Sequence, residues 1–295
     1  MLILLRKALK ELNKNDPLRM AGATAFFTTF ALPPIVVIII QALGLIFNRQ
    51  AIRGKLLQTL GSILGPDGSA QINQVLKAFR MIAHSSWNIV LGFIFLLFVA
   101  TTLFLIIKNS FNQIWKIRVM THRGIGPKLG DRLRSIIVIL IAGILFVMGL
   151  LGETAQAVLG SYIRQLSPLF AVYFNNVVNI ALSVIVVTVW FAILFRYLPD
   201  ARPSWSIVFV GGFVTSIFFN IGKVLLRYLL QSSNVGNVYG ASGSIVLILL
   251  FVFYSALILY YGIAFTKIWG LYRGHPILPL PYAMHYRLTE EREEG

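Results

Sequence analysis

The stretch that decides the fold is SIVLILLFVFYSALILYYGIAFTKI, residues 244–268, in which Lys267 is the one charged side chain. The hydrocarbon core of a bilayer is about 30 Å thick, so a helix needs about 20 mostly apolar residues to cross it. Residues 244–268 meet that length with little polar interruption. The stretch therefore predicts a transmembrane helix.

Five more runs of the chain are long and apolar enough to cross a membrane. They cover roughly residues 21–47, 87–107, 134–152, 175–195 and 207–230. Of the 295 residues, 57% are hydrophobic and 12% are charged, whereas an ordinary soluble domain carries about 25% charged residues. We therefore predict an all-α polytopic membrane protein with six transmembrane helices. The predicted parts are a basic segment (1–20), the six-helix domain (21–270) and a tail (271–295).

Two segments outside the spans carry amphipathic patterns. Leu2, Leu5, Leu9 and Leu12 recur at helical spacing in the basic N-terminal segment, which predicts an interfacial amphipathic helix. The loop at about 50–83 predicts two more amphipathic helices on the opposite side of the membrane. This loop is interpreted as a lid that only packs on the bundle or as a lid that grips a substrate.

The positive charges predict the orientation. The formal net charge is +16, and Lys and Arg concentrate in segments that stay in the cytoplasm. Most of the 26 Lys and Arg residues fall in the N-terminal segment, the 108–134 and 196–206 loops and the tail. These segments lie on one side of a six-span arrangement. We therefore expect both termini in the cytoplasm.

Reporter fusions test this orientation. A reporter that is active only in the cytoplasm should work when fused after Gly126 or Arg202 and should fail after Gly68 or Gly236. The reverse pattern at two or more of these sites would overturn the predicted topology.

The usual signatures of catalysis are missing from the sequence. There is no cysteine, which excludes disulfides and thiolate metal sites. The four histidines lie in separate loops or tails, and the acidic residues are scattered rather than grouped. A metal-dependent nuclease needs several carboxylates or histidines converging on its metals. We expect neither enzymatic activity nor a metal site, cofactor or nucleic-acid partner.

The most distinctive polar residues inside the predicted spans are Lys223 and Arg227, which share a helix face because they are four residues apart. Charges buried in a membrane usually face the protein interior or a wet cavity. By depth, Glu153, Asn179 and Asn220 lie in the same outer half. The hypothesis is a substrate-binding cluster of these five residues. The alternative is that the two cations snorkel to the interface.

Pro33 and Pro34 interrupt the first span. Proline removes a backbone donor and frees the carbonyl four residues earlier, and the hydroxyls of Thr28 and Thr29 could take part in the repair. A broken helix at membrane depth can line a cavity. A packed kink is the alternative interpretation.

Several motifs resemble the YihY/BrkB family of bacterial inner-membrane proteins, part of which once carried the label ribonuclease BN. The motifs are Asn15-Asp16-Pro17, AGATAFFTTFALPPI (21–35), GPDG (65–68), FNQIWKIR (111–118), FRYLPDARPSW (195–205), GGFVTSIFFNIGKVLLRYLL (211–230) and VYGASGSIVLILLFVFYSALILYYG (238–262). The family often ends its last span with a Gly-Ala-Glu-Phe-like sequence. Here Ala264 takes the acidic position, so no role of that acid is carried over.

The resemblance implies a six-span protein of the bacterial inner membrane without an established enzymatic mechanism. It also implies a link to the cell envelope and to lipid traffic. We expect a transporter or flippase-like protein for an amphipathic, anionic envelope lipid, with membrane lipids as partners. The alternatives are a scaffold for envelope machinery and an ion-coupled carrier of small solutes. Ion coupling normally needs a membrane-embedded acid, for which Glu153 is the one candidate.

Overall fold

A computed structural model gives the fold of the chain. It describes residues 1–45, 48–59, 86–120, 132–145, 147–149, 168–232 and 243–287, together with the single positions 61, 70, 73, 74, 77, 130 and 152. Most of the described residues are helical, and the two strands have three residues each. The predicted all-α class is therefore confirmed.

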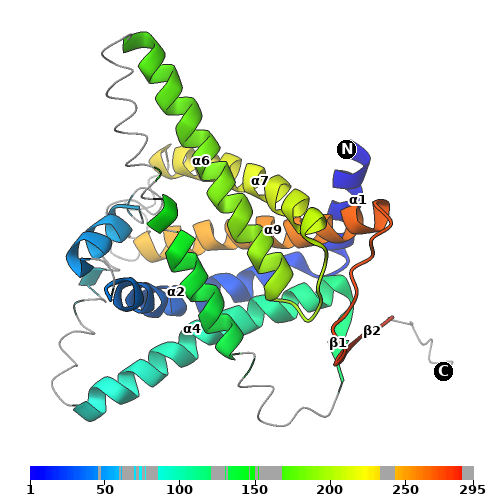
Figure 1. Cartoon of the computed structure of the whole chain (residues 1–295), viewed down its shortest axis with the longest axis horizontal. Coiled ribbons are helices and arrows are strands. Elements are labelled where there is room, and N and C mark those ends of the chain that lie inside the picture. The colour runs from blue at the N-terminus through cyan, green and yellow to red at the C-terminus, as the bar shows by residue number, and fades with distance from the viewer. Residues whose placement is uncertain are drawn as a thin grey trace.

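The long helices match the predicted spans (Figure 1). They are α2 (Pro17–Leu43), α4 (Ser86–Trp115), α6 (Pro168–Tyr197), α7 (Trp205–Ser232) and α9 (Gly243–Tyr272), with a further span at Arg132–Gly149. The shorter helix α1 (Leu2–Asn13) covers the predicted amphipathic N-terminal segment. Among the described residues, five helices are long and apolar enough to cross a membrane. The bent α2 makes a sixth when it is counted as one span.

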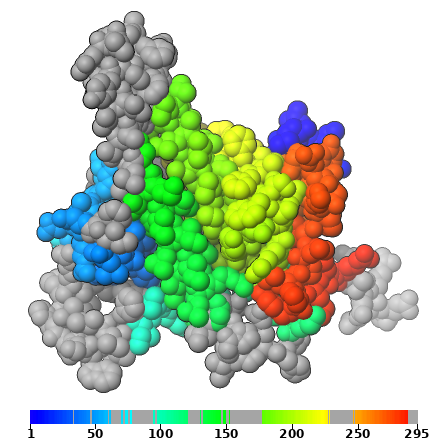
Figure 2. Space-filling model, in the orientation of Figure 1, coloured from blue at the N-terminus to red at the C-terminus, as the bar shows by residue number. Residues whose placement is uncertain are grey.

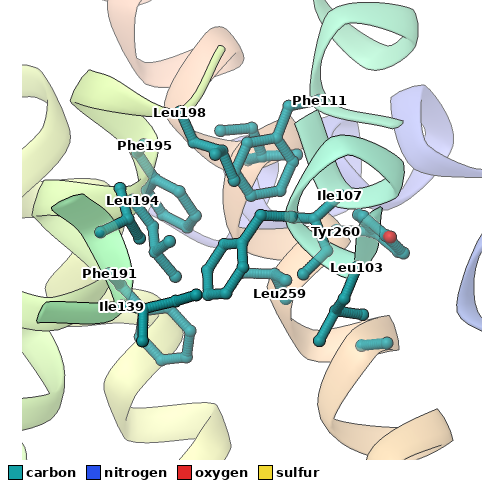
Figure 3. Close-up of a cluster of buried hydrophobic side chains, with 14 of the residues drawn as sticks. Leu103, Ile107, Phe111, Ile139, Phe191, Leu194, Phe195, Leu198, Leu259 and Tyr260 are labelled. Carbon is teal, nitrogen blue, oxygen red and sulfur yellow. The ribbon is translucent and has the colours of Figure 1, made fainter. Parts of the chain in front are cut away.

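The helix α9, whose sequence predicts the fold most clearly, lies at the centre of the bundle and packs against α1, α2, α4 and α7 (Figure 1). Its Tyr260 and Ile263 are fully buried. The core around α9 brings together Phe111 of α4, Ile139 of the Arg132–Gly149 span and Phe195 of α6 (Figure 3). A helix that is apolar on all sides, as α9 is, is expected to be buried or lipid-covered.

The double proline bends α2, as predicted. The segments Pro17–Leu32 and Pro34–Leu43 meet at 49°. The hydroxyls of Thr28 and Thr29 bond to the carbonyls of Thr24 and Ala25, at 2.6 and 3.0 Å. These carbonyls lie one turn before the ones that the prolines free, so the two hydroxyls do not repair the break.

The helices α7 and α9 approach closely through a reciprocal pair of glycines and threonines. Thr215 and Thr266 each donate to the glycine carbonyl four residues earlier on their own helix, Gly211 at 2.6 Å and Gly262 at 2.7 Å. A Cβ at Gly211 would lie 2.0 Å from Thr266 Oγ1, and one at Gly262 would lie 2.0 Å from Thr215 Oγ1. Small residues at helix contacts are the usual way for membrane helices to pack tightly.

Gly212 is the position where α7 meets the backbone of α6, and its substitution is expected to be costly. A Cβ there would lie 2.7 Å from Thr188 O and 3.0 Å from Ala192 N. Backbone atoms cannot rotate away, so Gly212→Ala should separate the helices and lower the Tm of the purified protein in detergent by several degrees. Gly22→Ala is the matched control, because nothing lies within 4 Å of a Cβ at that helical position. Equal Tm values for the two variants would contradict the close packing.

Two short strands and α1 complete the described fold at one end of the bundle. The strand β1 (Ile117–Val119) follows α4 and pairs antiparallel with β2 (Ala283–His285), with Arg118 opposite Met284. The predicted tail therefore packs back against the chain over this stretch.

The predicted amphipathic loop is helical at residues 49–59, where Ile52 and Leu56 are buried. Its second predicted helix lies largely outside the described residues.

Candidate functional site

Many of the polar contacts in the described structure gather at the end of the bundle where α2 and α7 begin and α4, α6 and α9 end. We call it the basic end. It holds Lys14, Arg19, Lys108, Lys116, Arg118, Arg134 and Lys267. In a bilayer this is the side that the charge pattern predicts to face the cytoplasm.

The most deeply buried charge at the basic end is Asp200, whose side chain is 0% exposed. One carboxylate oxygen lies 3.0 Å from Lys108 Nζ and 3.7 Å from a guanidinium nitrogen of Arg134. It also accepts a hydrogen bond from the Tyr282 hydroxyl at 3.1 Å. The other oxygen accepts from Asn112 Nδ2 at 2.7 Å. A buried carboxylate needs this many partners to offset its lost hydration.

The backbone places Asp200 where these partners meet. Asp200 follows α6 in a short turn, and its N–H donates to Asn112 Oδ1 at 2.9 Å. Its carbonyl accepts from Leu280 N at 3.0 Å, and Ala201 forms a bridge with Pro279. Asp200 therefore ties α4, the Arg132–Gly149 span, the α6–α7 turn and the C-terminal segment together.

A second polar anchor fixes α1 to the bundle. Lys267 Nζ of α9 lies 2.6 Å from a carboxylate oxygen of Glu11 and donates to the Ile114 carbonyl at 2.8 Å. Leu4 and Ala8 are buried against α7 and α9, and Tyr261 donates to the Leu5 carbonyl at 3.2 Å. The two helices lie together in Figure 2, with α1 in dark blue and the end of α9 in orange.

Beside this anchor lies an apolar groove of about 1200 Å³. The leucine stripe predicted in the N-terminal segment, Leu2, Leu5, Leu9 and Leu12, forms one wall. The opposite wall comes from α7 and α9. It consists of Phe218, Leu257, Ile258 and Tyr261. Arg6 and Arg19 are the cations that line the groove.

A polar pocket of about 730 Å³ adjoins the groove, because Asp16 and Arg19 line both. Lys14, Arg19, Lys116 and Arg118 are its four cationic lining residues. Among the described residues, Asp16 is the one carboxylate in its lining. The rest of the lining consists of Asn15, Asn109, Asn112, Gln113 and Tyr286 and of the apolar Ile117 and Val119 of β1. We call these two spaces the groove and the polar pocket.

The polar pocket is built around Lys116, which directly follows α4. Its backbone has φ = 57°, a left-handed conformation that is uncommon for a residue with a side chain. Lys116 Nζ donates to Asn15 Oδ1 at 3.0 Å, and Asn15 is 1% exposed. The Lys116 carbonyl accepts from Tyr286 N at 3.0 Å. The position of this ammonium group is therefore fixed by the turn between α1 and α2 and by the C-terminal segment.

The predicted outer cluster is only partly within the described residues. Lys223 is half-buried, Asn179 is exposed, and Asn220 accepts a hydrogen bond from Ser183 Oγ at 2.9 Å. Glu153 and the Arg227 side chain lie outside what the structure describes. The cluster stays a prediction, and so does a cavity lined at Pro33 and Pro34.

Asp200, Lys108 and Lys116 were not among the predicted site residues. Asp200 and Lys116 lie within motifs quoted for the resemblance, FRYLPDARPSW and FNQIWKIR, and Lys108 lies shortly before the second. The sequence signal for Asp200 was an Asp next to a Pro at the end of an apolar span.

Within the described part of the chain, no group of three or more His, Cys, Asp or Glu residues could hold a metal ion.

A bundle of apolar spanning helices with polar contacts concentrated at one end defines an integral membrane protein of the polytopic α-helical class. The family model for virulence factor BrkB matches residues 8–273. The chain therefore belongs to the BrkB family, as its motifs predicted.

The curated relatives are UPF0761 membrane proteins. One from Pseudomonas paraeruginosa is 28% identical over 252 residues, which is 82% of this chain and 56% of the relative. One from Alteromonas mediterranea is 24% identical over 250 residues, 83% of this chain and 80% of the relative. The chain thus spans just over half the length of the Pseudomonas relative. No solved structure matches the chain significantly.

Proposed function

We propose that this protein binds an anionic phospholipid at the basic end of the bundle and moves it across the bacterial inner membrane, with both termini in the cytoplasm. The observation behind the proposal is that a long apolar groove and a cation-lined polar pocket share the lining residues Asp16 and Arg19. An amphipathic molecule has this same division into an apolar part and a charged part.

The groove is long enough to hold part of an acyl chain. A helix rises about 1.5 Å per residue, so Leu257 lies about 22 Å along α9 from Tyr272. That distance exceeds half of a hydrocarbon core that is about 30 Å thick. The end of the groove at Leu257 therefore lies near the middle of the Ile248–Tyr272 span.

The headgroup, rather than the chain, must supply most of the selectivity. An acyl chain that leaves the bilayer for the groove exchanges one apolar environment for another, so its transfer provides little free energy. A Lys or Arg close to an anionic membrane surface contributes about 1 kcal/mol. Four cations and one carboxylate in the polar pocket thus favour an anionic headgroup over a zwitterionic one.

A transport assay tests the proposal. The full-length protein is reconstituted into liposomes with fluorescent phosphatidylglycerol or fluorescent phosphatidylcholine, with and without a proton gradient. We expect faster movement of phosphatidylglycerol between leaflets than in protein-free liposomes, and a smaller effect on phosphatidylcholine. Rates equal to those of protein-free liposomes under both conditions would contradict the transport function and favour a scaffold.

A further inference from the structure

We infer that the polar pocket is a phosphate-binding site in which Arg19 and Lys116 hold the phosphodiester of the lipid headgroup. The inference rests on the proposed function, since it names the part of the lipid that the pocket recognises. It assigns distinct positions to the two cations. Arg19 lies at the boundary between groove and pocket, and Lys116 lies within the pocket.

Arg19 is placed where the chemistry of a phospholipid changes from apolar to charged. It lines the groove beside Leu18 and the pocket beside Asn15. A phosphodiester joins the chain-bearing glycerol to the headgroup, so it occupies the same boundary in the lipid. A guanidinium presents two parallel N–H donors that match two phosphate oxygens.

The acidic neighbours of the exposed cations do not compete strongly with a phosphate. Arg19 lies 3.7 Å from Asp16, and their side chains are 68% and 75% exposed. Lys14 lies 3.8 Å from Glu11, and Glu11 is also held by Lys267 at 2.6 Å. Exposed ion pairs of this kind contribute little free energy. A dianionic or monoanionic phosphate can therefore replace water around these cations.

Lys116 supplies the ordered charge of the site. Asn15 and the bonded backbone at Tyr286 hold it in place before any ligand arrives, as described above. A cation that is already positioned loses less conformational entropy on binding. Lys116 Nζ contacts a neutral amide and lies 5.9 Å from the centre of the Tyr286 ring, and neither contact supplies a carboxylate counter-charge.

Binding is measured on the detergent-solubilised full-length protein, independently of transport. The probes are phosphatidylglycerol, phosphatidylcholine and inorganic phosphate, and the variants are Arg19→Gln, Lys116→Gln and Arg19→Lys. Arg202→Gln is the control, because Arg202 is an exposed cation at the same end that does not line the pocket. The Tm of each variant verifies that the protein is folded.

We expect Arg19→Gln and Lys116→Gln each to weaken phosphatidylglycerol binding by about fivefold, the effect of one interfacial cation. Arg19→Lys should weaken it less, and Arg202→Gln should not change it. Inorganic phosphate should compete with the lipid at a much higher concentration, because it lacks the acyl chains. Equal losses for Arg202→Gln and the pocket variants would overturn the inference. Equal affinity for phosphatidylcholine, which carries the same phosphodiester, would overturn the preference for an anionic headgroup.

Two outcomes separate this inference from the proposed function. Selective, variant-sensitive binding without transport would support the phosphate site and refute the transport function. Transport that the pocket variants leave unchanged would support the proposed function and refute the phosphate site. If inorganic phosphate binds as tightly as the lipid, the ligand is a soluble anion and the assignment to a lipid headgroup is wrong.

Discussion

Replacing Asp200 by asparagine is expected to destabilise the protein by about 3–5 kcal/mol, the usual effect of breaking a buried ion pair. The substitution keeps the size of the side chain and removes its negative charge. Lys108, which is 4% exposed, then loses a carboxylate at 3.0 Å, and Arg134 loses the same carboxylate at 3.7 Å. The buried Lys108 and the partly exposed Arg134 would be left without that counter-charge.

The measurement is the free energy of unfolding in mixed micelles, together with the Tm. Asp16→Asn is the matched control, since the Asp16 side chain is 75% exposed, and it should change stability only slightly. A second variant, Asp200→Asn with Lys108→Met, should recover part of the loss because it also removes a buried cation. An Asp200→Asn protein as stable as Asp16→Asn would contradict the role of this carboxylate.

The second large effect is expected in the groove. Leu9→Trp places an indole at a half-exposed position of α1 that lines the groove. The larger ring should occupy the space between α1 and α9 that an acyl chain would use. We expect phosphatidylglycerol transfer in liposomes to slow by about tenfold, which corresponds to about 1.4 kcal/mol in the barrier.

Ile3→Trp is the control for the groove variant. Ile3 is also on α1 and is 71% exposed, but it does not line the groove. It should leave both transfer and stability unchanged. If Leu9→Trp and Ile3→Trp transfer lipid at the same rate, the groove is not on the path of the lipid.

The spans could be predicted from the sequence because each depends on a local property. Residues 244–268 are apolar over the length that a bilayer requires, and the structure has α9 at Gly243–Tyr272. The bend in α2 was likewise predictable, since Pro33 and Pro34 cannot continue the hydrogen-bond ladder. The leucine stripe of α1 predicted an amphipathic helix, and the structure shows that its apolar wall faces a groove.

The basic end was harder to predict because its contacts join distant parts of the chain. Asp200 contacts Asn112 on α4, which is 88 residues earlier, and Tyr282 in the C-terminal segment. The local periodicity of helices and strands in the sequence does not predict such long-range contacts. The strands β1 and β2 have three residues each, which is too short for an alternating pattern to stand out. Polar residues in the quoted motifs were the sequence signal for the basic end. Which of them come into contact depends on how the helices pack.

Photo-crosslinking of a lipid in the membrane tests the central claim most directly. The protein is reconstituted with phosphatidylglycerol that carries a diazirine near the end of one acyl chain, and the labelled residues are identified by mass spectrometry. We expect labelling at Leu257 and Ile258 of α9 and at Leu5 or Leu9 of α1, with competition by unlabelled phosphatidylglycerol but not by phosphatidylcholine. Labelling spread evenly over exposed positions such as Ile144 and Ile180, with no effect of either competitor, would contradict a lipid site between α1 and α9.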